Sequence, residues 1–419
     1  MRIVSSLDIA PVWSGHPVGF ALLTTGGRQY VTFYDAERRM TVASRDVGSA
    51  SWQLDLVPET VGWNSHNFIA IAADTDGCLH LSGNMHNRQL IYYRTRQPHD
   101  AATFEAEHSM VGREENRCTY PQFLTGPRGE LVFTYRDGCS GNGVQIVNAY
   151  DPASRAWTRL LDTPLFDGQD QMSAYHRGPV TGPDGRYHMT WLWRDTPDCR
   201  TNHDISYARS TDLVRWETAG GHPLPLPITP DAQALVDPVP ACGGALNGQH
   251  PMGFDARNRA VISCMKYDEV GNSQIYLARV EDGRWRFAQA TRWDWRWAFE
   301  GMGAIPAGIQ VAPIELDADG RMVQSFHHVE YGYGSILLDD ATLAPVGEID
   351  AQWPFPASLG EVESAWPGME VQWAGDLGRS QQPGVRYVLR WETAGANRDR
   401  PREGPVPPPT MLRLYERAG

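Results

Sequence analysis

A tight turn recurs along this chain at intervals of roughly 50–70 residues, and each turn precedes a segment in which apolar and polar residues alternate. Glycine in such turns supplies the positive-φ position that a short hairpin needs, and the alternation has the period of a half-buried strand. The seven turns are Gly26-Gly27, Asp76-Gly77, Arg128-Gly129, Asp184-Gly185, Arg257-Asn258, Asp319-Gly320 and Pro383-Gly384. Hairpins at this spacing predict an all-β protein, and a seven-bladed β-propeller fits such radial repetition best.

A third strand follows most of the hairpins, often with a polar turn and a tryptophan. Examples lie at residues 40–52, 205–216 and 275–285. These segments resemble a degenerate Asp-box, the turn of sialidase-type propellers, and their recurrence in step with the hairpins favours a propeller. A six-bladed propeller with an extra hairpin is the structural alternative, whereas a β-sandwich or a solenoid fits the spacing less well.

We predict a single domain over residues 1–419 that is closed by pairing of the N-terminal strand with the last blade. The first strand-like run, R-I-V-S-S-L-D, has no hairpin partner of its own and can supply the outer strand of that blade. The proline-rich run before residue 410 reads as a loop and not as a linker between domains. The 15 Trp and 41 Gly residues, and the absence of long helix-forming runs, also favour strands and turns.

The chain is acidic, with a formal charge of −13 and a pI of about 5.4. We therefore expect neither nucleic acid nor an anionic membrane surface as a partner, and an acidic substrate would need a few local cations. Six scattered cysteines without a C-x-x-C pair do not indicate a disulfide scaffold. No signal peptide or apolar membrane span is visible. We expect a cytoplasmic monomer or weak oligomer, or a periplasmic or secreted protein if the start is truncated.

Histidines concentrate at the starts of the predicted inner strands, which face the central cavity of a propeller. Those starts are Gly15-His16, Ser65-His66-Asn67, Thr119-Tyr120, Tyr175-His176 and Gln249-His250. Four of the five contain histidine although the chain has only 13, so we expect a functional site on this rim. The end of an antiparallel neighbour lies at the same edge as the start of the first strand. The set expected to meet there is His66, His86, Tyr120 and Arg136.

Several motifs in this region carry a family resemblance. They are N-S-H-N-F-I-A-I-A-A-D-T-D-G-C-L-H-L-S-G-N-M-H-N, T-Y-P-Q-F, Y-R-D-G-C-S-G-N-G and S-A-Y-H-R-G-P. The chain resembles, over most of its length, the BNR-type propeller polysaccharide lyases. These include propeller ulvan lyases and the L-rhamnose-α-1,4-D-glucuronate lyases that trim gum arabic. The resemblance implies β-elimination at a glucuronic acid in an acidic oligosaccharide or polysaccharide, with the rhamnose–glucuronate linkage as the expected target.

Such an elimination requires a neutralised carboxylate, a base for the C5 proton and an acid for the departing oxygen. Arg136 suits the carboxylate because a guanidinium binds it bidentately. His66 is the expected base, since imidazole titrates near working pH. Tyr120 is the expected acid, and in a syn elimination also a candidate base. His86 matches a second histidine of the family and is expected to share proton transfer or bind substrate.

Each of these residues also has a structural interpretation. Arg136 could pair with Asp137 or Glu130, Tyr120 could be a core aromatic, and His86 could cap its turn. Further candidates for substrate binding lie beside the four or reach the same rim. They are Asn67, Asn87, Tyr175, His176, His16, His328 and Tyr331.

A metal is a separate question, because the chemistry outlined above requires no cofactor. Cys199, His203 and His250 form a ligand set that suits a structural Zn²⁺, although their spacing matches no zinc signature. A buried, unligated Cys199 is the alternative, and calcium held by rim carbonyls would leave no sequence trace.

Two other functions remain open from the sequence. An α-L-rhamnosidase on the same linkage would release rhamnose without an unsaturated product, but hydrolases generally use two carboxylates and no acidic pair stands in the rim motifs. A non-catalytic carbohydrate-binding propeller would bind sugar through the same residues and form no product. The matched acid and base residues on one rim favour the lyase.

Overall fold

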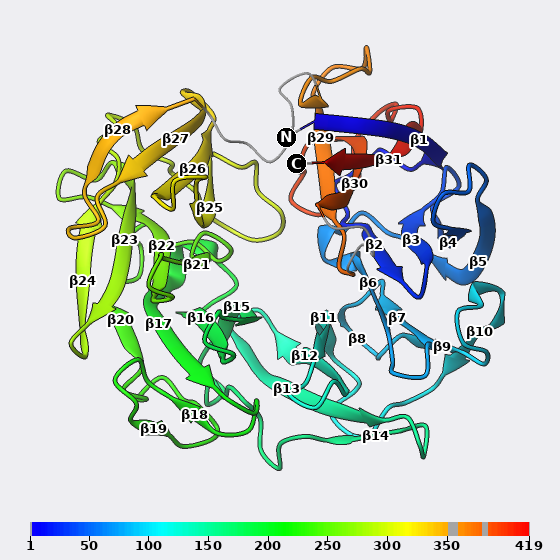
Figure 1. The fold of residues 1–419 in the computed structure, drawn as a ribbon, viewed down its shortest axis with the longest axis horizontal. Coiled ribbons are helices and arrows are strands. Elements are labelled where there is room, and N and C mark those ends of the chain that lie inside the picture. Colours follow the sequence, from blue (N-terminus) through cyan, green and yellow to red (C-terminus); the bar gives the residue numbers. More distant parts are fainter. Residues whose placement is uncertain (1, 351–358, 379–383, 419) are drawn as a thin grey trace.

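The computed structural model describes residues 2–350, 359–378 and 384–418, and its strands form seven separate antiparallel sheets around a central axis (Figure 1). Within these ranges there is no α-helix, only three short 3₁₀ helices. No helix among the described residues has the length and apolarity that crossing a membrane requires. The prediction of an all-β, seven-bladed propeller is confirmed.

The strands of the first three blades lie within residues 21–159, after the N-terminal strand. Blade 1 contains β2 (Ala21–Thr25), β3 (Arg28–Tyr34), β4 (Arg39–Asp46) and β5 (Gln53–Thr60). Blade 2 contains β6 (Ile69–Ala73), β7 (Leu79–Gly83), β9 (Tyr92–Thr95) and β10 (Phe104–Glu107), with the 3₁₀ helices η1 (Ser65–Asn67) and η2 (Ala101–Thr103). Blade 3 contains β11 (Cys118–Thr125), β12 (Leu131–Cys139), β13 (Asn142–Asp151) and β14 (Ala156–Arg159), and β8 (His86–Arg88) extends its inner edge.

The remaining blades follow in chain order. Blade 4 contains β15 (Ser173–Thr181), β16 (Tyr187–Arg194), β17 (Asn202–Ser210), β18 (Trp216–Glu217), β19 (Pro223–Leu224) and β20 (Leu235–Asp237), with η3 (Cys199–Thr201). Blade 5 contains β21 (Met252–Phe254), β22 (Ala260–Tyr267), β23 (Ser273–Glu281) and β24 (Arg284–Gln289). Blade 6 contains β25 (Ile309–Leu316), β26 (Met322–His328), β27 (Gly332–Leu338) and β28 (Pro345–Ile349). Blade 7 contains β29 (Met369–Gly375), β30 (Val385–Ala394), β31 (Thr410–Ala418) and β1 (Arg2–Val12).

Six of the seven expected turns join the first two strands of a blade, and Pro383 of the seventh lies outside the described residues. An aspartate ahead of the turn stabilises several of these hairpins. The Asp74 carboxylate accepts hydrogen bonds from the backbone N–H groups of residues 76 and 78. Asp255 and Asp317 repeat this pattern in blades 5 and 6. Such aspartates satisfy turn N–H groups that the strand ladder leaves unpaired.

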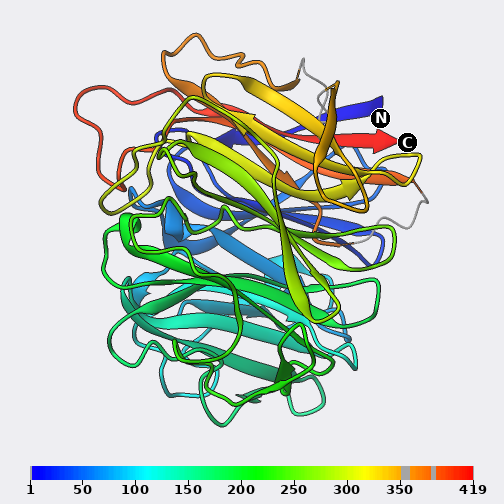
Figure 2. The same cartoon turned by 90° about the vertical axis from the view of Figure 1, so that its left-hand side faces the viewer.

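The N-terminal strand β1 lies on the outer edge of blade 7, in the sheet order β1-β31-β30-β29. Arg2 lies opposite Ala418, and Val12 lies opposite Thr410. The two ends of the chain are therefore side by side in Figure 1, and Figure 2 shows the same two strands running next to each other at the top of the ring. One sheet thus joins the beginning of the described chain to its end.

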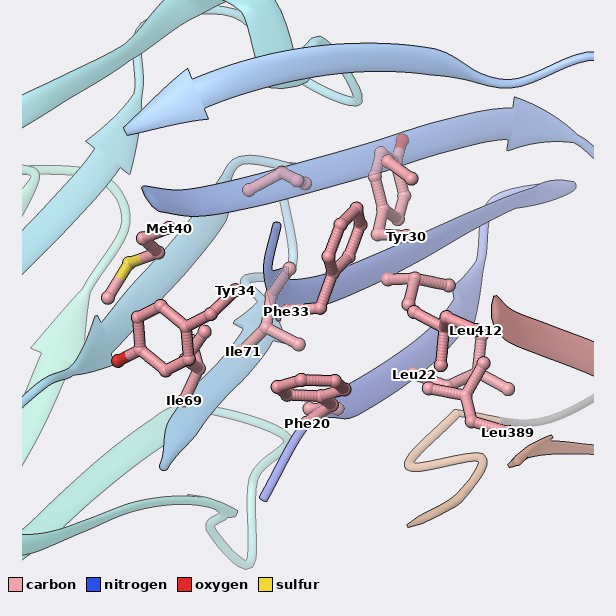
Figure 3. Packing of buried hydrophobic residues seen from close by; sticks show 14 of the residues in the cluster. Phe20, Leu22, Tyr30, Phe33, Tyr34, Met40, Ile69, Ile71, Leu389 and Leu412 are labelled. Carbon is pink, nitrogen blue, oxygen red and sulfur yellow. The ribbon is translucent and has the colours of Figure 1, made fainter. Parts of the chain in front are cut away.

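The core lies between neighbouring blades, where the faces of successive sheets meet. At the junction of blades 1 and 7, Leu22 and Leu412 are completely buried, and Phe20 stacks on Trp391 with ring centroids 4.5 Å apart. Figure 3 shows Leu389 and Leu412 of blade 7 against Leu22 of blade 1. Burying apolar side chains from both ends of the chain in one cluster stabilises the closed ring.

Candidate active site

A cavity of about 840 Å³ opens among the inner strands and rim loops, and it contains all four predicted catalytic residues. His66, His86, Tyr120 and Arg136 line it, and so do Asn87, Tyr175 and Cys199 from the predicted binding and metal sets. The loop before β6, the strand β8 and the ends of β11 and β12 supply the four. The starts of the first strands and the ends of the second strands therefore bring these four side chains to one cavity.

His66 and His86 reach each other through two short elements. His66 lies in η1, which Asn64 caps by accepting the backbone N–H of His66 at 2.9 Å. His86 begins β8, and β8 pairs with β11 so that His86 lies opposite Thr119. The two imidazoles consequently stack, with centroids 4.0 Å apart and planes inclined by 13°.

Tyr120 enters the cavity because β11 bulges at this point. Its φ is +60°, and the register with β12 shifts between Thr119 and Gln122. A bulge of this kind re-aims a side chain, and a non-glycine residue with positive φ costs free energy that the surroundings must offset. The ring lies 5.4 Å from that of His66. Burial raises the pKa of the Tyr120 phenol and Tyr175 reinforces this, so the phenol stays protonated near neutral pH.

Arg136 is buried near the end of β12, and its guanidinium stays largely unpaired. Nη1 donates to the Tyr175 hydroxyl at 3.2 Å, and the guanidinium carbon lies 4.9 Å from the centre of the Tyr120 ring. Nε and Nη2 have no hydrogen-bond partner in the described part of the chain. The acids considered as alternatives are engaged elsewhere, Asp137 with Arg117 and Glu130 with Arg128. Buried donors without partners are rare, so a cavity-lining guanidinium in this state is suited to a ligand oxyanion.

His86 is neutral over most of the pH range. Burial lowers its pKa to about 4, and the nearby His66 and Arg136 add to the effect. Its Nδ1 lies 2.7 Å from the side-chain amide nitrogen of Asn64. His86 therefore acts in the site as an uncharged imidazole and not as an acid with an ordinary pKa.

Asp399 belongs to the site and was not predicted from the sequence. Its Oδ1 accepts hydrogen bonds from His16 Nε2 at 3.0 Å and from the Ser65 backbone and hydroxyl, each at 2.9 Å. Its Oδ2 accepts the Ala304 N–H at 2.9 Å and lies 3.3 Å from His66 Nδ1. Burial alone would raise the pKa of Asp399, but the hydrogen bonds from His16, His66 and Ser65 outweigh it and hold that pKa well below its usual range.

Positive charge concentrates in the cavity although the whole chain carries −13. Asp399 is the sole carboxylate among the lining residues that the structure describes. Four guanidiniums line the same cavity: those of Arg136, Arg194, Arg398 and Arg400. Arg194 packs against the Tyr175 ring at 5.2 Å and donates to backbone carbonyls. Arg400 makes no hydrogen bond, ion pair or ring contact through its side chain in the described ranges.

Several predicted binding residues do not reach the cavity. His16 is fully buried behind it and holds Asp399, so it is not open to a sugar. Asn67 is buried in η1, and its carbonyl accepts the Tyr34 hydroxyl. His176 hydrogen-bonds the Gly178 carbonyl and packs on Phe166.

His328 and Tyr331 form part of an aromatic cluster in blade 6 that does not line the cavity. His328 is buried, with its ring centroid 4.6 Å from that of Trp293 and 4.4 Å from that of Trp295. Tyr331 packs against the same group and is 54% exposed. Trp293 and Trp295 therefore pack against His328 and do not line the cavity.

The structure does not bring Cys199, His203 and His250 together as metal ligands. His203 lies between Asp195 and Asp204, with both contacts at 2.9 Å. His250 is buried and bonded to Thr190, and burial lowers its pKa to about 3. Cys199 is the first residue of η3 and lines the cavity, whereas His203 and His250 do not. Nowhere in the described ranges do three or more His, Cys, Asp or Glu side chains form a group that could hold a metal ion.

The comparison with protein families identifies the chain. Residues 28–293 match the model of a family described as BNR repeat-containing. The chain belongs to this BNR repeat-containing family. No curated protein sequence matches it.

Solved structures of other proteins also superpose on this chain over nearly its whole length. The polysaccharide lyase Uly1 is 14% identical, covers 100% of both chains and superposes with a TM-score of 0.66. An ulvan lyase of polysaccharide lyase family 25, bound to -[GlcA(1-4)Rha3S]-, is also 14% identical. It covers 94% of this BNR-repeat chain and 97% of its own, with a TM-score of 0.65. At this identity the likeness establishes the propeller fold.

Proposed function

We propose that this BNR-repeat propeller is a polysaccharide lyase that cleaves the bond to O4 of a glucuronic acid by β-elimination, with L-rhamnose-α-1,4-D-glucuronate as the target linkage. The observation that carries the proposal is Arg136, a buried, cavity-lining guanidinium with two donor nitrogens, Nε and Nη2, unpaired within the described chain. It lies beside His66, His86 and Tyr120, which supply proton-transfer chemistry. The fold shared with polysaccharide lyases, one of them bound to a glucuronate–rhamnose unit, supports the assignment.

Three residues carry the three steps of the proposed elimination. Arg136 binds the uronate carboxylate and stabilises the charge that develops as the C5–H bond breaks. His66 takes the C5 proton, the C4–O4 bond breaks and the C4=C5 double bond forms. Tyr120, whose raised pKa keeps it protonated, gives its proton to the departing O4. The products are an unsaturated uronate and a new sugar hydroxyl. The enzyme is left with an imidazolium on His66 and a tyrosinate on Tyr120, and one proton returns from His66 to Tyr120 through solvent before the next turnover.

Hydrolysis fits the cavity less well. Glycosidases generally place two carboxylates across the scissile bond. The cavity offers only Asp399 among its described lining residues, and both oxygens of that carboxylate are already hydrogen-bonded. A rhamnosidase would therefore lack its second carboxylate.

The test follows ultraviolet absorbance from the C4=C5 double bond and free rhamnose together, using a rhamnosyl-glucuronate oligosaccharide, gum arabic and ulvan. We expect absorbance to rise with the wild type and kcat/KM to fall about 10²–10³-fold in Arg136→Ala, since one preorganised charge donor contributes that much. Arg136→Lys should recover part of the loss because it keeps the charge without the bidentate fork.

Two outcomes would contradict this function. Rhamnose released without absorbance would make the protein a hydrolase. An Arg136→Ala variant with normal elimination would remove the residue on which the proposal rests.

A further inference from the structure

One side-chain amide, that of Asn64, contacts both stacked imidazoles. Its Oδ1 lies 2.9 Å from the His66 backbone nitrogen and 2.8 Å from His66 Nδ1, and its Nδ2 lies 2.7 Å from His86 Nδ1. A backbone N–H can only donate, so the amide atom that faces it must be the oxygen. The backbone of η1 therefore sets the orientation of the amide, whatever the protonation of the two histidines.

This orientation determines where each imidazole carries its hydrogen. An amide oxygen only accepts, so His66 Nδ1 must be protonated. An amide NH₂ only donates, so His86 Nδ1 must present a lone pair. In the neutral rings the remaining nitrogens take the opposite states: His66 Nε2 is bare and His86 Nε2 carries the hydrogen.

We propose that Asn64 is a positioning residue that locks His66 and His86 in opposite tautomers, so that His66 Nε2 is the base and His86 Nε2–H is a hydrogen-bond donor. The assignment deepens the proposed elimination and rests on it for its chemical meaning. In the reaction the C5 proton passes to His66 Nε2, while His86 donates a hydrogen bond to the substrate without giving up its proton. The net proton transfer to O4 still comes from Tyr120.

Asp399 also distinguishes the two histidines, because it favours a positive charge on His66 and not on His86. Its Oδ2 lies 3.3 Å from His66 Nδ1, so it stabilises the imidazolium that forms when His66 takes a proton. His86 has no carboxylate partner within the described residues, and its neighbours His66 and Arg136 disfavour a charge on it. The ring centroids are 4.0 Å apart, so two imidazolium charges would repel each other strongly. Because only His66 has a counter-ion, His66 takes the charge and His86 stays neutral.

The discriminating variant is Asn64→Asp, which keeps the shape and the acceptors for His66 but replaces the amide NH₂ with an oxygen. That oxygen needs a hydrogen on His86 Nδ1, so the His86 tautomer should invert. We expect kcat to fall about 10²–10³-fold, because the inverted His86 no longer presents a preorganised hydrogen-bond donor at Nε2, with KM changed less than about threefold. Asn258→Asp adds the same charge in a hairpin turn of blade 5 outside the cavity and should leave both constants unchanged.

The direct readout is nitrogen NMR of the protein with ¹⁵N-labelled histidine, with signals assigned through His66→Gln and His86→Gln. Wild type should show His66 as the Nδ1–H form and His86 as the Nε2–H form, and Asn64→Asp should show His86 as Nδ1–H. A wild-type spectrum with His66 protonated at Nε2, or an unchanged His86 in a folded Asn64→Asp, would overturn the inference. Because the spectra need no turnover, they separate this result from failure of the elimination itself. If Asn64→Asp does not fold, the wild-type spectrum decides.

Discussion

At the scale of a residue, the position of Arg136 could be predicted from the sequence, but its hydrogen-bond partners could not. Strand alternation and the hairpin turn place it at the rim, and the family resemblance suggests its role. Only the structure shows that Asp137 and Glu130 pair with other arginines, leaving Arg136 Nε and Nη2 unpaired among the described residues. Local pattern gives a residue's position, but its free hydrogen-bonding capacity depends on partners from other strands.

Asp399 and Asn64 belong to the site, and neither was predicted from the sequence. Asp399 is 334 positions from Ser65, its hydrogen-bond partner, and lies in a loop without periodicity. No local rule connects residues so far apart. Asn64 carried a usable signal, since an asparagine directly before a short helical turn is a common N-cap. His16 was expected to bind substrate, but it is fully buried and hydrogen-bonds Asp399 outside the cavity lining.

The buried histidines predict how stability depends on pH. Burial lowers the pKa of His86, His176 and His328 to about 4 and that of His250 to about 3, whereas an unfolded histidine titrates near 6.5. The unfolded chain therefore binds protons first as pH falls, so this stability is fully present above about pH 6.5 and is lost as pH falls towards 4 and 3. We expect the melting temperature to decline over that interval by scanning calorimetry, and to decline less steeply in His250→Gln. An equal slope in both proteins would contradict this assignment.

At the scale of an element, the strands that hold the site are regular and the segments that aim its side chains are not. The hairpins β11–β12 and β6–β7 follow from turn and alternation signals. The bulge at Tyr120 and the addition of β8 to blade 3 do not, because a three-residue strand has too few positions to show a period. Short β18, β19 and β20 in blade 4 were invisible for the same reason.

The loop between β30 and β31 yields a prediction about the substrate. It brings Arg398 and Arg400 to the cavity, and Arg398 is held by carbonyls of residues 300 and 302. We expect Arg400→Gln to raise KM for ulvan about tenfold at low salt, because an unpaired guanidinium at the cavity can bind an anionic group next to the uronate. Chemically desulfated ulvan is the matched substrate on which the change should be smaller.

Arg284→Gln is the control for this loop. It removes an exposed arginine from β24, far from the cavity lining, and should leave KM unchanged on both polymers. If Arg400→Gln and Arg284→Gln change KM by the same factor, Arg400 does not bind a substrate group directly and acts only through the overall charge of the protein.

At the scale of the whole molecule, closure of the ring depends on blade 7. Leu412 of β31 is completely buried against blade 1, so Leu412→Ala leaves a cavity at the closing junction. We expect it to lower the free energy of unfolding by roughly 2–5 kcal/mol. In Leu56→Ala, where the side chain is 58% exposed, the change should stay within about 0.5 kcal/mol. Urea denaturation measures both, and equal losses would show that the junction does not carry this energy.

The contact between Asp399 and His66 also sets an order of events during synthesis. The ribosome makes His66 early, but Asp399 emerges only when nearly all of the described chain has been translated. His66, Ser65 and His16 cannot contact Asp399, their common partner, before the loop between β30 and β31 is made and blade 7 docks on blade 1. If His66 is the base of the proposed elimination, the stabilisation that Asp399 gives to its imidazolium becomes available only after blade 7 has docked on blade 1.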